Sequence, residues 1–298
     1  MAEKEDDRPV DVDIIRAPEE LTTESRDSPT PTPVLTWVLA AAFVAGVAAV
    51  AYIEFRGPGQ PAPVATTRRD RDLPPDAAAN LGGAAMPVVV PPLDQSDPVV
   101  RELVRQLTSH PQVAAWLATD GLVRNFTVVM VNTADGATPA RHLRVLRPAA
   151  AFSVDTTANG LVLDPRSYRR YDGIASAIAS VDAGGAARIY ATLKPRITDA
   201  YRDLGHPDTP VDQPLERALI ALLETPVVEG PIHLHPVKGT GYAFDDPRLE
   251  SLTDAQKQLL RTGPDNMRTI QGSLRSIALA VGIPASRLPA ARTVVETR

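Results

Sequence analysis

An apolar run over residues 34–53, VLTWVLAAAFVAGVAAVAYI, is the feature that most constrains how this chain folds. The run contains no charged side chain, and its length matches the roughly 20 apolar residues that cross a bilayer core as a helix. Lipid offers no partner for backbone N–H and C=O groups, so a spanning segment satisfies them internally, as a helix does. Trp37 and Tyr52 lie near its two ends, where aromatic rings favour the headgroup level. We therefore predict one transmembrane helix over residues 34–53, with the lipid bilayer as its partner.

The composition divides the rest of the chain into four segments. Residues 1–33 are rich in Asp and Glu, and we expect a disordered acidic tail because too little apolar area offsets the entropy lost on ordering. Residues 54–96 are rich in Pro, Gly and Ala and are predicted to form an extended linker. Residues 97–283 carry the hydrophobic periodicity of a folded domain. The periodicity is lost beyond this point, and residues 284–298 are expected to fray.

The apolar run has an alternative interpretation as a cleaved signal peptide, because Ala49-Val50-Ala51 resembles a small-residue cleavage site. The preceding region is long and acidic rather than short and basic, which favours an uncleaved anchor. More arginines follow the run than closely precede it, and the positive-inside rule would then place the C-terminal domain in the cytoplasm. A short inner tail with a large exported domain is the commoner arrangement. We therefore predict a single-pass protein of the inner (cytoplasmic) membrane with a periplasmic C-terminal domain.

Bulk composition excludes several kinds of site. The chain of 298 residues contains no cysteine, which rules out disulfides, thiolate zinc sites and a cysteine nucleophile. The formal net charge is −5, so the chain lacks the basic footprint of a nucleic-acid-binding protein. The sequence also lacks the nucleophile-elbow, HExxH and P-loop motifs. We expect no cofactor and no nucleic-acid partner.

Apolar residues at helical spacing predict a compact, predominantly helical α+β domain. We expect helices over residues 97–107, 111–118, 122–132 and 165–181, a long helix around 189–204 with Pro195 inside it, and helices from Asp212, Thr253 and Pro264. Gly184-Gly185 is predicted to separate the helix that ends near residue 181 from the long helix. Thr253 and Gln256 have the spacing of a capping box.

Two small β-hairpins complete the predicted domain. Asn159-Gly160 is a turn pair between the short apolar stretches 152–154 and 161–163. Alternating residues in 232–235 and 242–244 flank a turn that contains glycine. The large apolar side chains of Trp116, Phe126 and Met130 are interpreted as core residues rather than as a cofactor box.

Four stretches carry a resemblance to a known family: SYRRYDGIASAIASVDAGG, AYRDLGHP, TPVVEGPIHL and YAFDDPRLESLTDAQKQLLRTGPDN. They resemble a bacterial family of single-pass membrane proteins that is known only as a domain of unknown function. The resemblance covers roughly residues 93–282, and the last stretch is its most specific part. It implies an anchored, mostly exported helical domain in Gram-negative bacteria, and it implies no catalytic residue. The loop DTPVDQPLERAL departs from the family pattern because it lacks the aromatic residues expected at that helix start.

The densest polar group within the patterned region contains Gln256, Lys257, Arg261, Asp265 and Asn266. Lys257 and Arg261 are like charges one helical turn apart, which costs a few tenths of a kcal/mol unless an anion lies nearby. The group is therefore a candidate recognition patch for an acidic partner. The alternative is that Arg261 and Asp265 brace the corner before the last helix.

Two other groups of residues are weaker candidates for a functional site. His233 and His235 would face one side of a strand, but a metal site needs a third ligand and supporting contacts, so we predict none. Glu216 and Glu224 lie eight residues apart on one helix, about 12 Å along its axis, which is too far for the facing carboxylates of glycan cleavage. Both glutamates are interpreted as part of a solvated face.

The function favoured by these patterns is that of a tethered binding or assembly module in the cell envelope, with an envelope protein or an acidic polymer as its partner. The alternative is an envelope enzyme that acts on glycan or peptide. An enzyme would need a cleft lined by polar groups with perturbed pKa values. A binding module needs only an exposed apolar or cationic patch.

Overall fold

The computed structural model describes residues 81–238 and 241–295. The transmembrane helix predicted over residues 34–53 and the acidic tail over residues 1–33 lie outside the described residues. Among the helices that are described, none is both long enough and apolar enough to cross a membrane.

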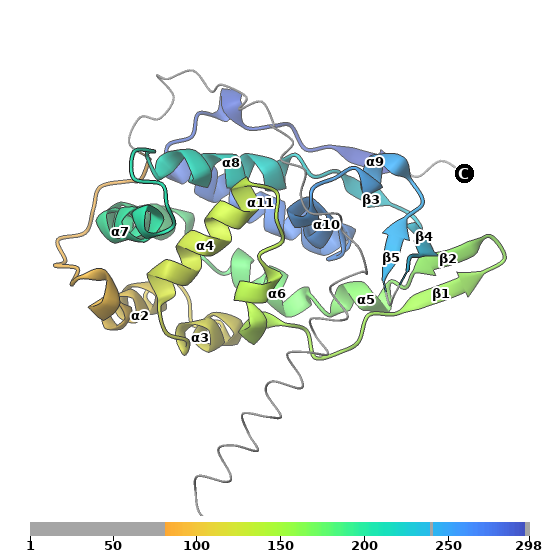
Figure 1. Cartoon of the computed structure of the whole chain (residues 1–298), viewed down its shortest axis with the longest axis horizontal. Helices are drawn as coiled ribbons and strands as arrows, with labels where there is room; N and C mark the ends of the chain where they lie inside the picture. The colour runs from red at the N-terminus through yellow and green to blue at the C-terminus, as the bar shows by residue number, and fades with distance from the viewer. Residues whose placement is uncertain (1–80, 239–240, 296–298) are drawn as a thin grey trace, which may run out of the picture. The chain divides into compact units, whose positions relative to one another are not determined.

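The described residues form an α+β domain in which helices predominate (Figure 1). The α-helices are α2 (Asp97–Arg105), α3 (Pro111–Leu117), α4 (Leu122–Ala134), α5 (Arg166–Arg169), α6 (Asp172–Ala179), α7 (Ala183–Asp203), α8 (Asp212–Leu223), α9 (Pro247–Glu250), α10 (Asp254–Leu260) and α11 (Pro264–Ala280). Short 3₁₀ turns lie at η2 (Leu93–Gln95), η3 (Ala140–His142), η4 (Arg144–Leu146) and η5 (Ala285–Arg287). Helical periodicity therefore identified most of the helices, including α4, whose valine-rich sequence is also compatible with a strand.

The principal core lies between α4, α7, α8 and α11, which pack against one another. Each helix contributes residues spaced three or four apart, and the buried set includes Leu122, Met130, Leu193, Ile197, Leu219, Leu223 and Ala278. Burying one such large apolar side chain stabilises the fold by about 1.5–3 kcal/mol. A second core cluster lies beneath the sheet and contains Leu163, Leu234, Phe244, Leu260 and Met267.

The two predicted hairpins are both present, and they join into one sheet. Strand β1 (Val154–Thr157) pairs with β2 (Gly160–Leu163), and β4 (His233–Pro236) pairs with β5 (Tyr242–Phe244). Antiparallel pairing of β2 with β4 then gives a four-stranded sheet in the order β1-β2-β4-β5. Figure 1 shows this sheet at the end of the helical layer nearest α5 and α9.

The ends of the domain differ from the sequence prediction. Leu81, which was assigned to the linker, is buried, and the N–H of Gly82 donates to the carbonyl of Val281 at 2.7 Å. Leu288 is also buried, and β6 (Thr293–Val295) pairs in parallel with β3 (Val227–Glu229). The predicted linker and frayed tail are therefore wrong for residues 81–96 and 284–295, because tertiary contacts hold these segments although neither shows a local period.

Two predictions about local helix breaks are also corrected. The chain forms α5 and α6 with a break at Arg170 and Tyr171, in place of one helix over residues 165–181. Gly184-Gly185 does not separate helices but lies in the first turn of α7, where the Asp182 carboxylate accepts from the N–H of Gly185 at 2.5 Å. A Cβ at residue 185 would overlap the Leu107 side chain and lie 2.8 Å from the Asp182 carboxylate. Close packing at the start of α7, rather than a helix break, thus accounts for Gly185.

This geometry predicts opposite effects for the two neighbouring glycines. Gly184 is exposed, and a Cβ there would make only ordinary van der Waals contacts with the Asp182 and Arg188 side chains, so Gly184→Ala should raise the free energy of unfolding by up to about 1 kcal/mol. Gly185→Ala should lower it by about 1–3 kcal/mol through overpacking against Leu107. Thermal unfolding of the two full-length variants, followed by circular dichroism, measures the difference. Equal shifts in Tm would contradict the close approach at residue 185.

Candidate functional site

The five residues predicted as a recognition patch lie at the corner between α10 and α11, where several of them make contacts within the domain. The capping box of Thr253 and Gln256 is confirmed, and Gln256 Nε2 also donates to the carbonyl of Ala221 at 3.0 Å. Asn266 Nδ2 donates to the carbonyl of Tyr168 at 3.1 Å and to a carboxylate oxygen of Asp172 at 2.9 Å. These amide groups therefore hold α10 and α11 to α8, α5 and α6.

The charged members of the patch have separate partners. Lys257 Nζ lies 2.5 Å from Glu250 Oε1, and only 14% of the Lys257 side chain is exposed. Burial alone would raise the pKa of Glu250, but its hydrogen bonds with Lys257 and the Phe244 N–H outweigh that effect, and the pKa is lowered. Asp265 is almost fully exposed and pairs with Arg268 at 2.9 Å, within the same helix. Arg261 is the remaining charge, and it faces inward.

The Arg261 guanidinium lies beside an aromatic ring of β5, that of Phe244. Its central carbon is 5.9 Å from the centre of the Phe244 ring. Burial lowers the pKa of Arg261, and the negative charges of Asp254 and Glu250 together with the Tyr171 hydroxyl only partly offset this effect. The sequence thus selected Arg261 as a candidate binding residue, whereas the structure places it against the Phe244 ring rather than on an exposed helix face.

Another arginine, Arg170, contacts Tyr171. The Tyr171 hydroxyl accepts hydrogen bonds from Arg170 Nη2 at 3.3 Å and from Gln258 Nε2 at 3.2 Å. The Arg170 guanidinium carbon lies 5.3 Å from the centre of the Tyr171 ring and 5.8 Å from that of Phe152, and the Phe152 ring lies 5.9 Å from that of Tyr242. We refer to Phe152, Arg170, Tyr171, Tyr242 and Arg261 as the arginine–aromatic cluster.

Sequence reasoning missed four members of this cluster. Phe152 precedes β1, Arg170 and Tyr171 lie at the break between α5 and α6, Tyr242 begins β5, and Arg261 directly follows α10. These positions are far apart in the chain, and no local spacing connects them. The break between α5 and α6, which the sequence pattern also missed, is what positions Arg170 and Tyr171.

The carboxylate of Asp212, the first residue of α8, is a buried charged group with several partners. One of its oxygens accepts from the Tyr190 hydroxyl at 2.5 Å, and the other accepts from Lys194 Nζ at 2.5 Å and the Leu81 N–H at 3.1 Å. Burial, followed by the hydrogen bond to Asp212, raises the pKa of Tyr190 far above its usual value. Strongly shifted groups often mark active sites. Here, however, each group is occupied by another member of the network, which indicates a structural role.

Glu216 lies one turn further along α8 and is also buried, so its assignment to a solvated face was wrong. Its carboxylate pairs with Arg287 of η5, a tertiary contact that no helical pattern reveals. Burial raises the pKa of Glu216 despite this pairing, and the charge of Asp212 adds to the shift. The folded state therefore holds this proton more tightly than the unfolded chain, and the resulting stabilisation is lost as the pH rises through the raised pKa.

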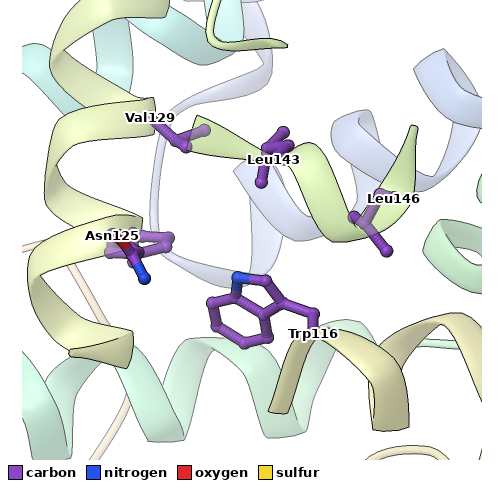
Figure 2. A pocket seen from close by; sticks show the side chains of 6 residues that line it. Trp116, Asn125, Val129, Leu143 and Leu146 are labelled. Atoms are coloured by element: carbon purple, nitrogen blue, oxygen red, sulfur yellow. The ribbon is translucent and has the colours of Figure 1, made fainter. Parts of the chain in front are cut away.

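An open cavity of about 190 Å³ lies between α3, α4 and the segment that follows α4. Its lining is formed by Trp116, Asn125, Phe126, Val129, Leu143 and Leu146. Figure 2 shows the Trp116 indole on one side of the cavity, with Val129 and Leu143 opposite it and Asn125 at one end. Trp116 and Phe126, which were interpreted as core residues, do pack against the core, but they also face this cavity, which we call the apolar groove.

The two histidines of β4 do not assemble a metal centre. His235 Nδ1 lies 2.6 Å from Asp245 Oδ1 across the second hairpin, and both side chains are about half exposed. Within residues 81–238 and 241–295, no three His, Asp or Glu side chains lie close enough together to hold a metal ion.

The described residues form an α+β domain that carries the apolar groove and the half-buried arginine–aromatic cluster. Residues 122–278 match the family DUF3014, which is described as a protein of unknown function. Because this match spans more than half of the chain, the chain belongs to that family. The resemblance to a domain of unknown function is thereby confirmed. Comparison with curated proteins gives no match, and comparison with solved structures gives none either.

The Asp212 network predicts a large and specific loss of stability. Asp212→Asn leaves one acceptor oxygen for three donors and turns an amide toward them, so the free energy of unfolding should fall by about 3–5 kcal/mol. Asp199→Asn removes a half-exposed partner of Arg196 and should change it by less than about 1 kcal/mol. Urea unfolding of both full-length variants measures the difference, and similar small effects would show that the Asp212 network contributes little to stability.

Proposed function

We propose that this protein is a membrane-tethered binding or assembly module of the cell envelope, and that the apolar groove accommodates a side chain of its partner. The observation that carries the proposal is the lining of the groove, in which Asn125 is the single polar residue. An enzyme needs titratable groups that face a cleft. Tyr190 and Glu216, whose pKa values are raised by burial, are instead enclosed in the core and paired with Asp212 and Arg287.

The size of the groove favours a macromolecular partner. Pockets that hold cofactors and drug-sized ligands usually measure about 300–1,000 Å³, whereas this cavity measures about 190 Å³. A cavity of this size suits one large apolar anchor residue. Anchor residues that fill such pockets supply most of the binding free energy at many protein interfaces. The proposed partner is therefore an envelope protein that presents an apolar side chain to Trp116 and Leu146.

The tether in this proposal is the apolar run over residues 34–53, and the proposed location of the domain is the periplasm. Its support is the length and composition of the run, which meet the requirement for a helix that crosses a bilayer. The residues between this run and the described domain are rich in proline and glycine, so the domain would stand clear of the headgroups.

Occupation of the groove can be measured through Trp116. The chain contains two tryptophans, so Trp37→Phe leaves Trp116 as the only one. In this full-length background a neutral apolar dye, N-phenyl-1-naphthylamine, should quench Trp116 emission by energy transfer. Leu146→Asp should weaken dye binding about tenfold or more, because it places a charge in the groove. Leu279→Asp, at an exposed leucine of α11, is the matched control and should leave binding unchanged. Equal dye affinities in the two variants would contradict a binding role for the groove.

The tether and its orientation are tested by a fusion. A reporter that is active only outside the cytoplasm, joined after Arg298, should be active and should sediment with membranes. Deletion of residues 34–53 should release the fusion from the membrane fraction and abolish reporter activity. Activity of a cytoplasm-specific reporter at the same junction would reverse the proposed orientation and would agree with the excess of arginines after the run.

A further inference from the structure

The arginine–aromatic cluster contains two cations that lack an anionic partner among the described residues. Arg170 is hydrogen-bonded only to the Tyr171 hydroxyl, and its Nε and Nη1 atoms are buried without any hydrogen-bond partner. Arg261 is half-buried and contacts the Phe244 ring, and it forms no ion pair with a carboxylate in this part of the chain. Other arginines and lysines do form such pairs, for example Arg166 with Asp164 and Lys194 with Asp212.

Such an arrangement is unfavourable by itself. A guanidinium that loses water without gaining hydrogen-bond acceptors loses stabilisation, and the faces of aromatic rings compensate only in part. The Tyr171 hydroxyl accepts from Arg170 and Gln258, so its own proton remains available to a further acceptor. The cluster therefore presents the Arg170 guanidinium and the Tyr171 hydroxyl side by side, with the Arg261 guanidinium against the Phe244 ring, and all three groups are donors.

The charges and the donor types match a phosphate group. A phosphate monoester carries a charge of about −1.5 to −2 near neutral pH and has three acceptor oxygens, so it can neutralise two guanidiniums, whereas a carboxylate can neutralise one. Arginine forms paired, parallel hydrogen bonds to phosphate oxygens, which the lysine ammonium does not. We infer that the arginine–aromatic cluster is a binding site for a phosphate group.

Access to the site depends on Phe152. This residue lies outside the strands, in the segment just before β1, and 39% of it is exposed. Its ring and that of Tyr242, which is 36% exposed, form the outer side of the cluster. A phosphate reaches Arg170 Nε when the Phe152 ring moves off the guanidinium. The site shares no residue with the apolar groove, so this inference is independent of the groove.

The test is thermal unfolding of the full-length protein in detergent, with increasing inorganic phosphate at constant ionic strength. Phosphate should raise Tm more than sulfate does, because a ligand that binds the folded state stabilises it. Arg170→Gln and Arg261→Gln should each weaken the apparent affinity about tenfold or more. Arg169→Gln, at the exposed neighbouring arginine, carries the same charge change and should behave like the native protein.

A second readout separates binding from a purely structural role. Removing an unpaired buried cation should leave Tm unchanged or raise it in the absence of phosphate, so Arg170→Gln should lose the response to phosphate without losing stability. Arg261→Lys keeps the charge but not the paired donors, and it should also bind phosphate about tenfold more weakly or worse. No phosphate-specific shift in the native protein, or equal shifts in the native protein and both arginine variants, would overturn the inference.

The source of the phosphate group is resolved by two further ligands. Dihexanoyl phosphatidic acid and dihexanoyl phosphatidylcholine, both below their micelle-forming concentrations, present a phosphate monoester and a shielded diester on the same lipid. Tighter binding of phosphatidic acid than of inorganic phosphate, dependent on Arg170, would assign the site to a lipid headgroup. Equal binding would assign it to soluble phosphate esters. Both outcomes support a phosphate site.

Discussion

The Asp212 carboxylate is the interaction on which the rest of the domain depends. It lies at the first residue of α8, where it accepts from the Leu81 N–H and from the side chains of Tyr190 and Lys194 on α7. Removing one partner of a buried charge is far more damaging than losing an exposed ion pair, so these segments are fixed together. One turn later Glu216 binds Arg287 and attaches the C-terminal segment to the same helix face. Helix α8 thus connects both ends of the domain.

The buried carboxylates of α8 and the two arginines Arg170 and Arg261 differ in the partners that they have. Around α8 each buried carboxylate has a cationic partner, whereas Arg170 and Arg261 are held among rings without one in the described part of the chain. A domain that pairs the buried carboxylates of α8 with cations, but leaves Arg170 and Arg261 without an anionic partner among the described residues, points to an external anion for these arginines. This contrast marks the arginine–aromatic cluster as a candidate binding site more clearly than the presence of charge alone, because charged residues are present both around α8 and in the cluster.

The sequence predicts the features that depend on local physics. Apolar spacing identified α4 and α8, turn residues identified both hairpins, and the interaction of Thr253 with Gln256 is the predicted capping box. The predictions from the sequence were wrong where contacts between residues far apart in the chain determine the structure. The pairing of β2 with β4 and of β3 with β6 joins residues far apart in the chain. The propensity of glycine likewise favours a helix break at Gly185. In the structure this glycine instead lets the start of α7 pack closely against Leu107, a residue far from it in the sequence.

The recognition patch predicted from the sequence stays a prediction, and the structure shows where its residues lie. Arg261 was selected from its charge and spacing, but an exposed patch with Lys257 was expected, and the structure separates the two cations by giving them different partners. The other members of the cluster could not be found, because their relation exists only after the sheet packs beside α6 and α10. Sequence patterning therefore selected Arg261, while the side chains that surround it could be known only from the tertiary structure.

One connection supplies part of both candidate sites. The segment 135–153 between α4 and β1 contains only the short turns η3 and η4, and loops of this length in a compact domain are uncommon and usually functional. Leu143 and Leu146 of this segment line the apolar groove, and Phe152 covers Arg170 in the arginine–aromatic cluster. A rigid helical scaffold that presents contact residues on one long connection is a common way to build recognition surfaces. The family match includes this whole connection, so both sites lie largely or wholly within the family domain.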